Sequence, residues 1–219
     1  MAPKITLYLD IVSPFAYLSY HILKNSPIFA KCEITYIPIF LGGVMKACGN
    51  TPPIKIKNKD QWINKERLRW AKNFNIPMKE TMPDGFPPLT LGVQRALCAI
   101  TAHSPQHFTP CLDALYHSFW YDGNSKIGTP EGFKPVLEGV LGADGAAHII
   151  AESTTPPIKE LLNKNTEKAI EDGAFGLPWF VCTNEKGEKE GFWGVDHLGQ
   201  VALFLGLDRG VDGGFRALL

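Results

Sequence analysis

The chain has 219 residues, of which 45% are hydrophobic and 20% charged, so it can bury a core without disulfide or metal staples. Lys plus Arg and Asp plus Glu both number 22, and this zero net charge argues against a nucleic-acid-binding face, which needs an excess of positive charge. No apolar run reaches the roughly 20 residues of a membrane span, and the N-terminus lacks the apolar core of a signal peptide. We therefore expect neither nucleic acid nor a membrane among the partners.

The cysteines predict free thiols rather than a disulfide framework. Their number is odd, and no two are spaced as Cys-x-x-Cys, so neither paired bridges nor a zinc knuckle is indicated. Free cysteine packs as a small hydrophobe, and we expect these residues to be buried or partly buried in a reducing compartment. No metal site is predicted. The cysteines are Cys32, Cys48, Cys98, Cys111 and Cys182.

The first 40 residues predict a strand, a helix and a second strand. Residues 5–12 are apolar and β-branched almost throughout, as in a strand that is buried on both faces. Ser13 and Pro14 follow at once, and these residue types favour the N-cap and first turn of a helix, which should end near Asn25. Residues 32–39 form the second strand. A βαβ unit of this kind has parallel strands and a right-handed crossover.

The middle of the chain is predicted to be helical. A segment with four prolines, residues 75–88, is expected to be a loop. Thr109 is a plausible N-cap for the third of these helices, and Gly173 a stop signal after the last. The predicted helices cover residues 62–73, 90–103, 110–121, 130–141, 145–152 and 156–172.

Strands return near the C-terminus. Residues 179–183 and 190–193 flank Asn-Glu-Lys-Gly at 184–187, which predicts a β-hairpin. Asp196 is expected to cap a last helix over residues 197–205. The order of elements predicts an α/β fold in which residues 1–60 and 173–219 share one sheet, and residues 61–172 form an all-helical insertion. We call residues 61–172 the helical insertion below.

Two segments are candidates for chemistry. Ser13 stands where a buried strand ends and a helix begins, so its hydroxyl and the free N–H groups of the helix would stabilise a thiolate or another small anion. The alternative is that Ser13 is only an N-cap, worth about 1 kcal/mol. Pro178 follows a Gly-rich approach to a strand, where a cis bond would leave the Leu177 backbone free to bind a peptide-like ligand. The alternative is a trans proline that only blocks a sheet edge.

Together these segments resemble the thioredoxin fold. The Cys-x-x-Cys of its disulfide oxidoreductases is replaced at residues 13–16 by Ser-Pro-Phe-Ala, so dithiol exchange through that motif is impossible. The helical insertion resembles that of the DsbA-type proteins. The narrower pattern is similar to the kappa-class glutathione transferases and the related 2-hydroxychromene-2-carboxylate isomerases. The matching motifs are Asp-Ile-Val-Ser-Pro-Phe (10–15), Gly-Asn-Thr-Pro-Pro (49–53), Gly-Ala-Phe-Gly-Leu-Pro (173–178) and Trp-Gly-Val-Asp (193–196).

The resemblance implies glutathione as the co-substrate and assigns roles to individual residues. Ser13 matches the catalytic serine, whose hydroxyl hydrogen-bonds the glutathione sulfur and favours the thiolate. Asn50 matches a polar residue that contacts glutathione, although a turn residue before Pro-Pro is the alternative. Leu177 matches the backbone clamp beside cis-Pro178. Asp196 matches the acid that holds the γ-glutamyl amine, and a plain helix cap is its alternative.

The resemblance is looser at three further glutathione-binding positions. Lys59 and Trp62 lie where the family places a basic and an aromatic residue near the glycyl carboxylate. Lys55, Lys57 and Lys59 alternate, so any of them could serve, or all could be a solvated charge run. The family has a serine that binds the γ-glutamyl carboxylate where this chain has Val195, so backbone N–H groups at that turn would have to hold the carboxylate.

The function implied is conjugation of the glutathione thiolate to small electrophiles in detoxification, with reduction of hydroperoxides as a further peroxidase activity. Residues 40–45 and the helices from 62 to 121 would wall an apolar pocket for the electrophile. Two alternatives stay open: a glutathione-dependent isomerase of the hydroxychromene type, and a non-catalytic thioredoxin-fold binding protein. The resemblance also implies a homodimer and an intracellular location, mitochondrial, peroxisomal or cytoplasmic.

Overall fold

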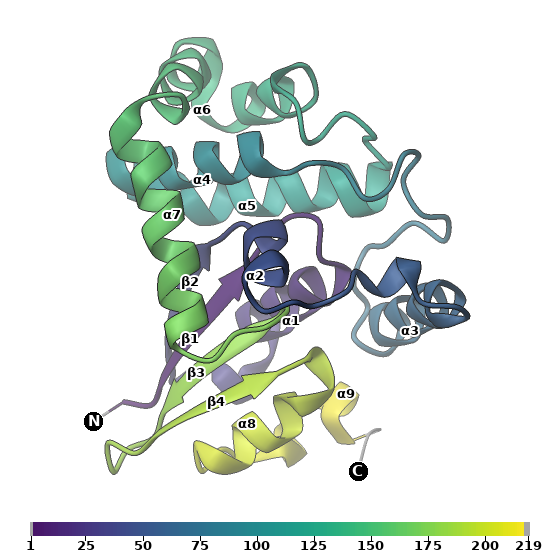
Figure 1. Ribbon diagram of the computed structural model, residues 1–219. Helices are drawn as coiled ribbons and strands as arrows, with labels where there is room; N and C mark the ends of the chain where they lie inside the picture. The colour runs from purple at the N-terminus through teal and green to yellow at the C-terminus, as the bar shows by residue number, and fades with distance from the viewer. Residues whose placement is uncertain (1, 217–219) are drawn as a thin grey trace.

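A four-stranded mixed sheet forms the centre of the protein, whose computed structural model describes residues 2–216 (Figure 1). The strand order is β2-β1-β3-β4, in which β1 and β2 run parallel and both β1–β3 and β3–β4 are antiparallel. The expected parallel first pair and C-terminal hairpin are therefore confirmed. The strands are β1 (Lys4–Leu9), β2 (Glu33–Pro38), β3 (Trp179–Thr183) and β4 (Lys189–Trp193).

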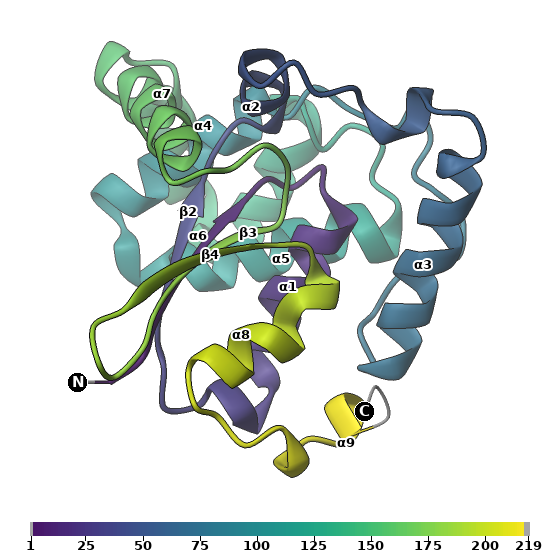
Figure 2. The ribbon, with the colours of Figure 1, turned by 60° about the horizontal axis from the view of Figure 1, so that its bottom comes forward.

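Helices cover both faces of this sheet, and further helices form a second layer beside it. Figure 2 shows α2, α4 and α7 on one side of the strands and α1 and α8 on the other. The α-helices are α1 (Pro14–Asn25), α2 (Leu41–Ala47), α3 (Lys59–Asn73), α4 (Leu91–His103), α5 (Phe108–His117), α6 (Pro130–Ser153), α7 (Pro156–Glu171), α8 (Leu198–Phe204) and α9 (Gly213–Arg216). Short 3₁₀ turns are η1 (Pro27–Phe29), η2 (Pro53–Lys55), η3 (Pro105–His107), η5 (Val195–His197) and η6 (Arg209–Val211), and η4 (Ser118–Asp122) is a π-helical turn.

The helical layer and the sheet share one hydrophobic core. Leu9 and Ile39 at the end of the parallel strand pair are fully buried in the same cluster as Val93 and Leu97 of α4. Helix α7 packs against both α2 and β2. Burial of this continuous apolar surface is the main force that holds the helices α4–α7 on the sheet. The proposed division at residues 60 and 172 stays a prediction.

Several predicted element boundaries were wrong for local reasons. Helix α5 begins at Phe108 rather than at Pro110, so Thr109 lies inside the helix and does not cap it. The two helices predicted over 130–152 are nearly continuous in α6, with a break at Gly142, whose φ of 74° and ψ of 167° are not helical. Helix α2 was not predicted, because its seven residues include two glycines and no capping side chain of their own.

Within residues 2–216, no helix combines the length and the hydrophobicity that crossing a membrane requires.

Candidate functional site

Strand register brings the predicted functional segments to one edge of the sheet. At this edge Leu9 lies opposite Pro38, and Tyr8 lies opposite Trp179, which in turn faces Trp193. The turn after β1, the segment before β3 and the turn after β4 must therefore meet there. Figures 1 and 2 show these three segments together at the start of α1.

Ser13 occupies the N-cap position of α1, as predicted. Its backbone is extended, with φ −87° and ψ 113°, and its Oγ accepts a hydrogen bond from the Ala16 N–H at 3.2 Å. The side chain is nearly buried, at 5% exposure. Its hydroxyl proton meets no acceptor among residues 2–216, so the O–H can donate to a ligand atom while the oxygen still caps the helix. The N-cap reading and the anion-binding reading are therefore compatible.

Asp10 is a buried carboxyl three residues before Ser13, and the sequence assigned it no role of its own. Its two oxygens accept hydrogen bonds from the Val12 N–H at 3.2 Å and from the Leu41 N–H at 2.9 Å. Leu41 is the first residue of α2, which has no side-chain cap of its own, so Asp10 caps that helix from the turn after β1. Burial raises the pKa of Asp10 to about 6, and the backbone donors and the Thr90 hydroxyl only partly offset this.

Leu177 and Pro178 form the approach to β3, and the bond between them is cis, as the family resemblance implied, and not trans. The Pro178 carbonyl accepts a hydrogen bond from the Gly194 N–H at 3.1 Å, which ties this segment to the turn after β4. The Leu177 N–H and C=O lie outside the ladder and make no hydrogen bond with other residues in the 2–216 range. Both groups are therefore available to pair with an extended peptide.

Asn50 lies beside that approach rather than in an isolated turn. Its Nδ2 donates to the Phe175 carbonyl at 2.8 Å, and its backbone N–H donates to the Met45 carbonyl, also at 2.8 Å. The side chain is exposed, and its amide oxygen takes no part in these bonds. Asn50 thus supports the segment that carries Leu177 and keeps one polar atom for a ligand.

Trp62 lies near the start of α1, while Lys59 is one turn earlier on α3. The Trp62 ring is half exposed, and its centroid is 6.5 Å from that of Phe15, two residues beyond Ser13. Lys59 is exposed at the first residue of α3, and its ammonium forms no ion pair with residues 2–216. Lys55 and Lys57 are exposed as well, so the structure does not select one of the three lysines.

The turn after β4 differs from the prediction at Asp196. Asp196 lies inside η5, neither η5 nor α8 has a side-chain cap, and His197 occupies the N-cap position of α8. The expected capping role was therefore wrong, because a 3₁₀ turn precedes the helix. The Asp196 side chain is exposed and folds back over Gly194, whose φ is 93°. Val195 is 2% exposed, so its side chain belongs to the core.

His197 is the residue at this turn that the sequence did not single out. Its Nδ1 is buried without a hydrogen-bond partner and lies 3.6 Å from an Asp196 carboxylate oxygen. No spacing or motif in the sequence marks His197, because its distinguishing feature, the unpaired ring nitrogen, is visible only in the folded structure.

The cysteines do not form a redox pair. Five free thiols are present, and Cys98, Cys111 and Cys182 are buried, which raises their pKa values to about 12, 11 and 12. Cys32 is partly buried, and burial raises its pKa to about 11. Cys48 departs from the expected burial: it is exposed, and its Sγ lies 3.5 Å from the Ala174 carbonyl. Within residues 2–216, no three His, Cys, Asp or Glu side chains converge as metal ligands would.

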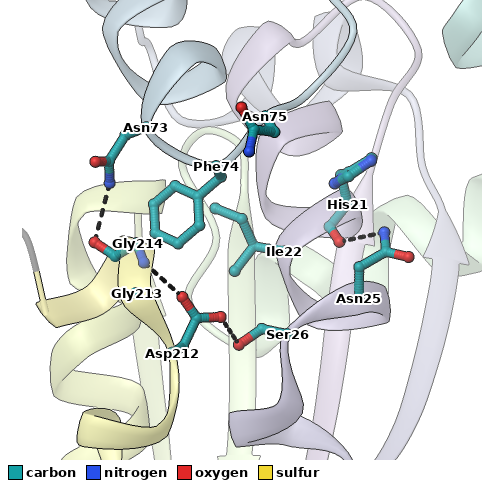
Figure 3. Close-up of a pocket in the computed structure, with 10 residues that line it drawn as sticks. All are labelled: His21, Ile22, Asn25, Ser26, Asn73, Phe74, Asn75, Asp212, Gly213 and Gly214. Atoms are coloured by element: carbon teal, nitrogen blue, oxygen red, sulfur yellow. Dashed lines mark hydrogen bonds between the residues drawn. The ribbon is translucent and has the colours of Figure 1, made fainter.

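Two cavities beside the C-terminal end of α3 lie away from this sheet edge. One, of about 310 Å³, sits at the C-terminal end of α1, where Asp212 bonds Ser26 and Gly214 (Figure 3). Another, of about 740 Å³, lies between α3 and the end of α5 and is lined by residues that include Met78 and Tyr121. The second is on helices expected to wall an electrophile pocket, but neither cavity is lined by a predicted glutathione-binding residue.

Comparison with known proteins gives consistent matches over nearly the whole chain. Residues 4–206 match the family described as DSBA-like thioredoxin domain. Glutathione S-transferase kappa 1 of Caenorhabditis elegans is 27% identical over 210 residues, covering 91% of this chain and 89% of that protein. The human protein of the same name is 25% identical, covering 92% and 90%. A solved 2-hydroxychromene-2-carboxylate isomerase superposes with a TM-score of 0.75 at 22% identity, covering 93% and 94%.

Proposed function

The chain belongs to the DsbA-like thioredoxin domain family, and from this premise we propose that it is a glutathione transferase of the kappa type. The observation that carries the proposal is the unused Ser13 hydroxyl donor at the N-terminus of α1, on the sheet edge that also holds the free Leu177 backbone. The cysteine pair of a disulfide oxidoreductase is missing from this turn.

In the proposed site, glutathione binds along the sheet edge. The Leu177 N–H and C=O pair with its cysteinyl residue as an added strand would, and Asn50 contacts the same part of the peptide from the turn after α2. The exposed Asp196 carboxylate holds the γ-glutamyl amine. Lys59 and Trp62 on α3 lie toward the glycyl carboxylate. Residues 1–60 and 173–219 would supply this binding unit, with Trp62 added from the start of the helical insertion.

The chemistry needs a populated thiolate and little else. The Ser13 O–H donates to the glutathione sulfur, and the partial positive charge at the start of α1 lowers the free energy of the anion. The thiol proton is released to water. The thiolate then attacks an electrophilic carbon, a sulfur–carbon bond forms, and the leaving group departs with its electron pair. The protein contributes position and anion stabilisation.

The decisive experiment replaces Ser13 by alanine and measures conjugation of 1-chloro-2,4-dinitrobenzene. We expect kcat to fall roughly 100-fold, as when one preorganised donor to a developing anion is removed, with glutathione binding retained. Ser26→Ala is the matched control, because Ser26 also caps a helical turn but lies at the far end of α1. Equal turnover in the Ser13→Ala variant and in the wild type would reject the role of Ser13.

One observation favours the non-catalytic alternative. Val195 is buried and its side chain has no hydrogen-bond donor, so the neighbouring backbone N–H groups must bind the γ-glutamyl carboxylate. Calorimetric titration with glutathione separates the two readings. Binding supports the transferase, whereas no heat of binding at tens of millimolar glutathione would favour a binding protein with another ligand.

Other aspects of the proposal extend from the family resemblance. A substrate screen with hydroperoxides and with hydroxychromene-type carboxylates would distinguish transferase, peroxidase and isomerase, because all three use the same thiolate. We further propose a homodimer, to be checked by sedimentation, and an intracellular location, where glutathione is abundant.

A further inference from the structure

The turn that carries Ser13 is held by side chains from the helical insertion. Gln94 of α4 is fully buried, and its Nε2 donates to the Leu9 carbonyl at 3.0 Å and to the Ile39 carbonyl at 2.7 Å. Its Oε1 accepts from the Ile11 N–H at 3.4 Å. A single amide thus pairs with the last residue of β1, the residue that follows β2 and the turn between β1 and α1.

A second buried donor reaches the same turn from another element of the insertion. Trp120, in the π-helical turn η4 after α5, is 1% exposed, and its Nε1 donates to the Ile11 carbonyl at 3.0 Å. Both backbone polar groups of Ile11 are therefore paired with side chains more than 80 residues away along the chain. Ile11 itself is fully buried, two residues before Ser13.

This arrangement fixes the Ser13 hydroxyl more tightly than the helix cap alone. A buried carbonyl or amide that loses its partner costs free energy, so the turn cannot shift without breaking these bonds. Water is excluded from Ile11 and cannot replace the missing partner. A displacement of a reacting or stabilising group by about 1 Å can cost as much as 100-fold in rate. The position of the Ser13 O–H is therefore coupled to the packing of α4 and η4.

We propose that Gln94 and Trp120 are positioning residues, through which the helical insertion sets the Ser13 hydroxyl against the sulfur of the bound thiol. The proposal rests on the proposed glutathione transferase function. It gives the insertion a role in the thiolate step in addition to any contact with an electrophile. Neither residue lies on the peptide-binding segments around Leu177 and Asp196, so their loss should leave glutathione binding intact.

The test replaces Gln94 by methionine, which has a similar shape but no amide donor or acceptor. We expect kcat for conjugation to fall about tenfold with KM for glutathione unchanged, because the displaced hydroxyl stabilises the thiolate less well. The ultraviolet absorbance of the bound thiolate, followed against pH, should show a raised pKa of the glutathione thiol. Trp120→Phe removes the other donor, and it carries the test if Gln94→Met does not fold.

Tyr17→Phe is the matched control. Tyr17 is buried on α1 and its hydroxyl donates to the Pro77 carbonyl at 2.9 Å, so the control also loses a partly buried hydrogen bond to the insertion but leaves the bonds of Ile11 intact. A selective fall in kcat and a raised thiol pKa in the Gln94 and Trp120 variants support the proposal. If the wild type is active, but the Gln94 and Trp120 variants have the same kcat and thiol pKa as Tyr17→Phe, the positioning role alone is overturned. A wild type that binds no glutathione overturns the proposed function and this role together.

Discussion

The buried carboxyl of Asp10 predicts a specific dependence of stability on pH. Burial raises its pKa from the ordinary 3.8 to about 6 in the folded protein, which at 1.36 kcal/mol per tenfold change corresponds to about 3 kcal/mol. Below pH 3.8 the carboxyl is protonated in both the folded and the unfolded chain, and it costs nothing. As the pH rises toward 6, Asp10 ionises first in the unfolded chain, so the free energy of unfolding falls. Above pH 6 the full cost of burying the ionised carboxyl is present.

Asp10→Asn isolates this contribution, because asparagine does not titrate. At pH 4 the variant should be the less stable protein, since one of the two backbone N–H groups now faces an amide donor instead of a carboxyl oxygen. Between pH 4 and 7 the free energy of unfolding of the variant should gain on that of the wild type by up to about 3 kcal/mol.

The assay is urea unfolding of both proteins at a series of pH values from 4 to 7.5. Asp196→Asn is the control, since it makes the same change of side chain at an exposed carboxylate. The carboxyl of Asp172 has a lowered pKa in the folded chain and contributes the opposite slope, but it is present in all variants and cancels in the differences. Parallel profiles for Asp10→Asn and the wild type would refute the reasoning.

Two further predictions concern backbone support. At Gly194, where φ is 93°, an alanine Cβ would stand 2.2 Å from a carboxylate oxygen of Asp196, so Gly194→Ala should lower stability by about 1–2 kcal/mol and raise KM for glutathione. Gly206→Ala is the control, because Gly206 has a φ of 70° but no atom within 4 Å, so this variant should show the backbone cost alone. Equal KM values for the two variants would contradict the assignment of Asp196 to the glutathione site. Arg67 is fully buried and donates to two carbonyls of the loop before α4, so Arg67→Met should lower the stability measured by thermal unfolding by about 3 kcal/mol. Arg69→Met, on the exposed face of the same helix, should cost almost nothing. Similar losses in the two variants would show that burial is not the cause.

Local signals in the sequence were sufficient for the parts of the site that depend on neighbouring residues. Ser13 and Pro14 predict the start of α1, and the structure places both there. The hairpin turn at 184–187 follows from Asn and Gly, and the Asn184 side chain indeed accepts the N–H groups of Lys186 and Glu188. These features arise from bonds between residues at most four apart, which a pattern of residue types can record.

The support of the site was not predictable, because it depends on contacts that only the folded chain creates. Asp10 caps α2 from 31 residues away, and Trp120 reaches Ile11 across 109 residues. In the sequence Gln94 is a single polar residue in a mostly apolar helix, and glutamine is ordinarily expected at a solvent-exposed position. Asp196 shows the converse error, since a residue type that favours caps was placed in a 3₁₀ turn by the geometry of the chain leaving β4.

The Ser13 turn has no cysteine, and this absence bears on the role of the hydrogen bonds that hold the turn and the Leu177 segment in place. A cysteine nucleophile would be covalently fixed to the turn and would carry its own position with it. Under the proposed function the reactive sulfur arrives with the ligand, so the protein must fix the donor and the peptide clamp separately and hold them in register. The bonds of Gln94 and Trp120 to Ile11 hold the first, and the bond between Pro178 and Gly194 holds the second. Both are anchored where β1 ends and the antiparallel β3 begins, and strand pairing allows little relative movement there.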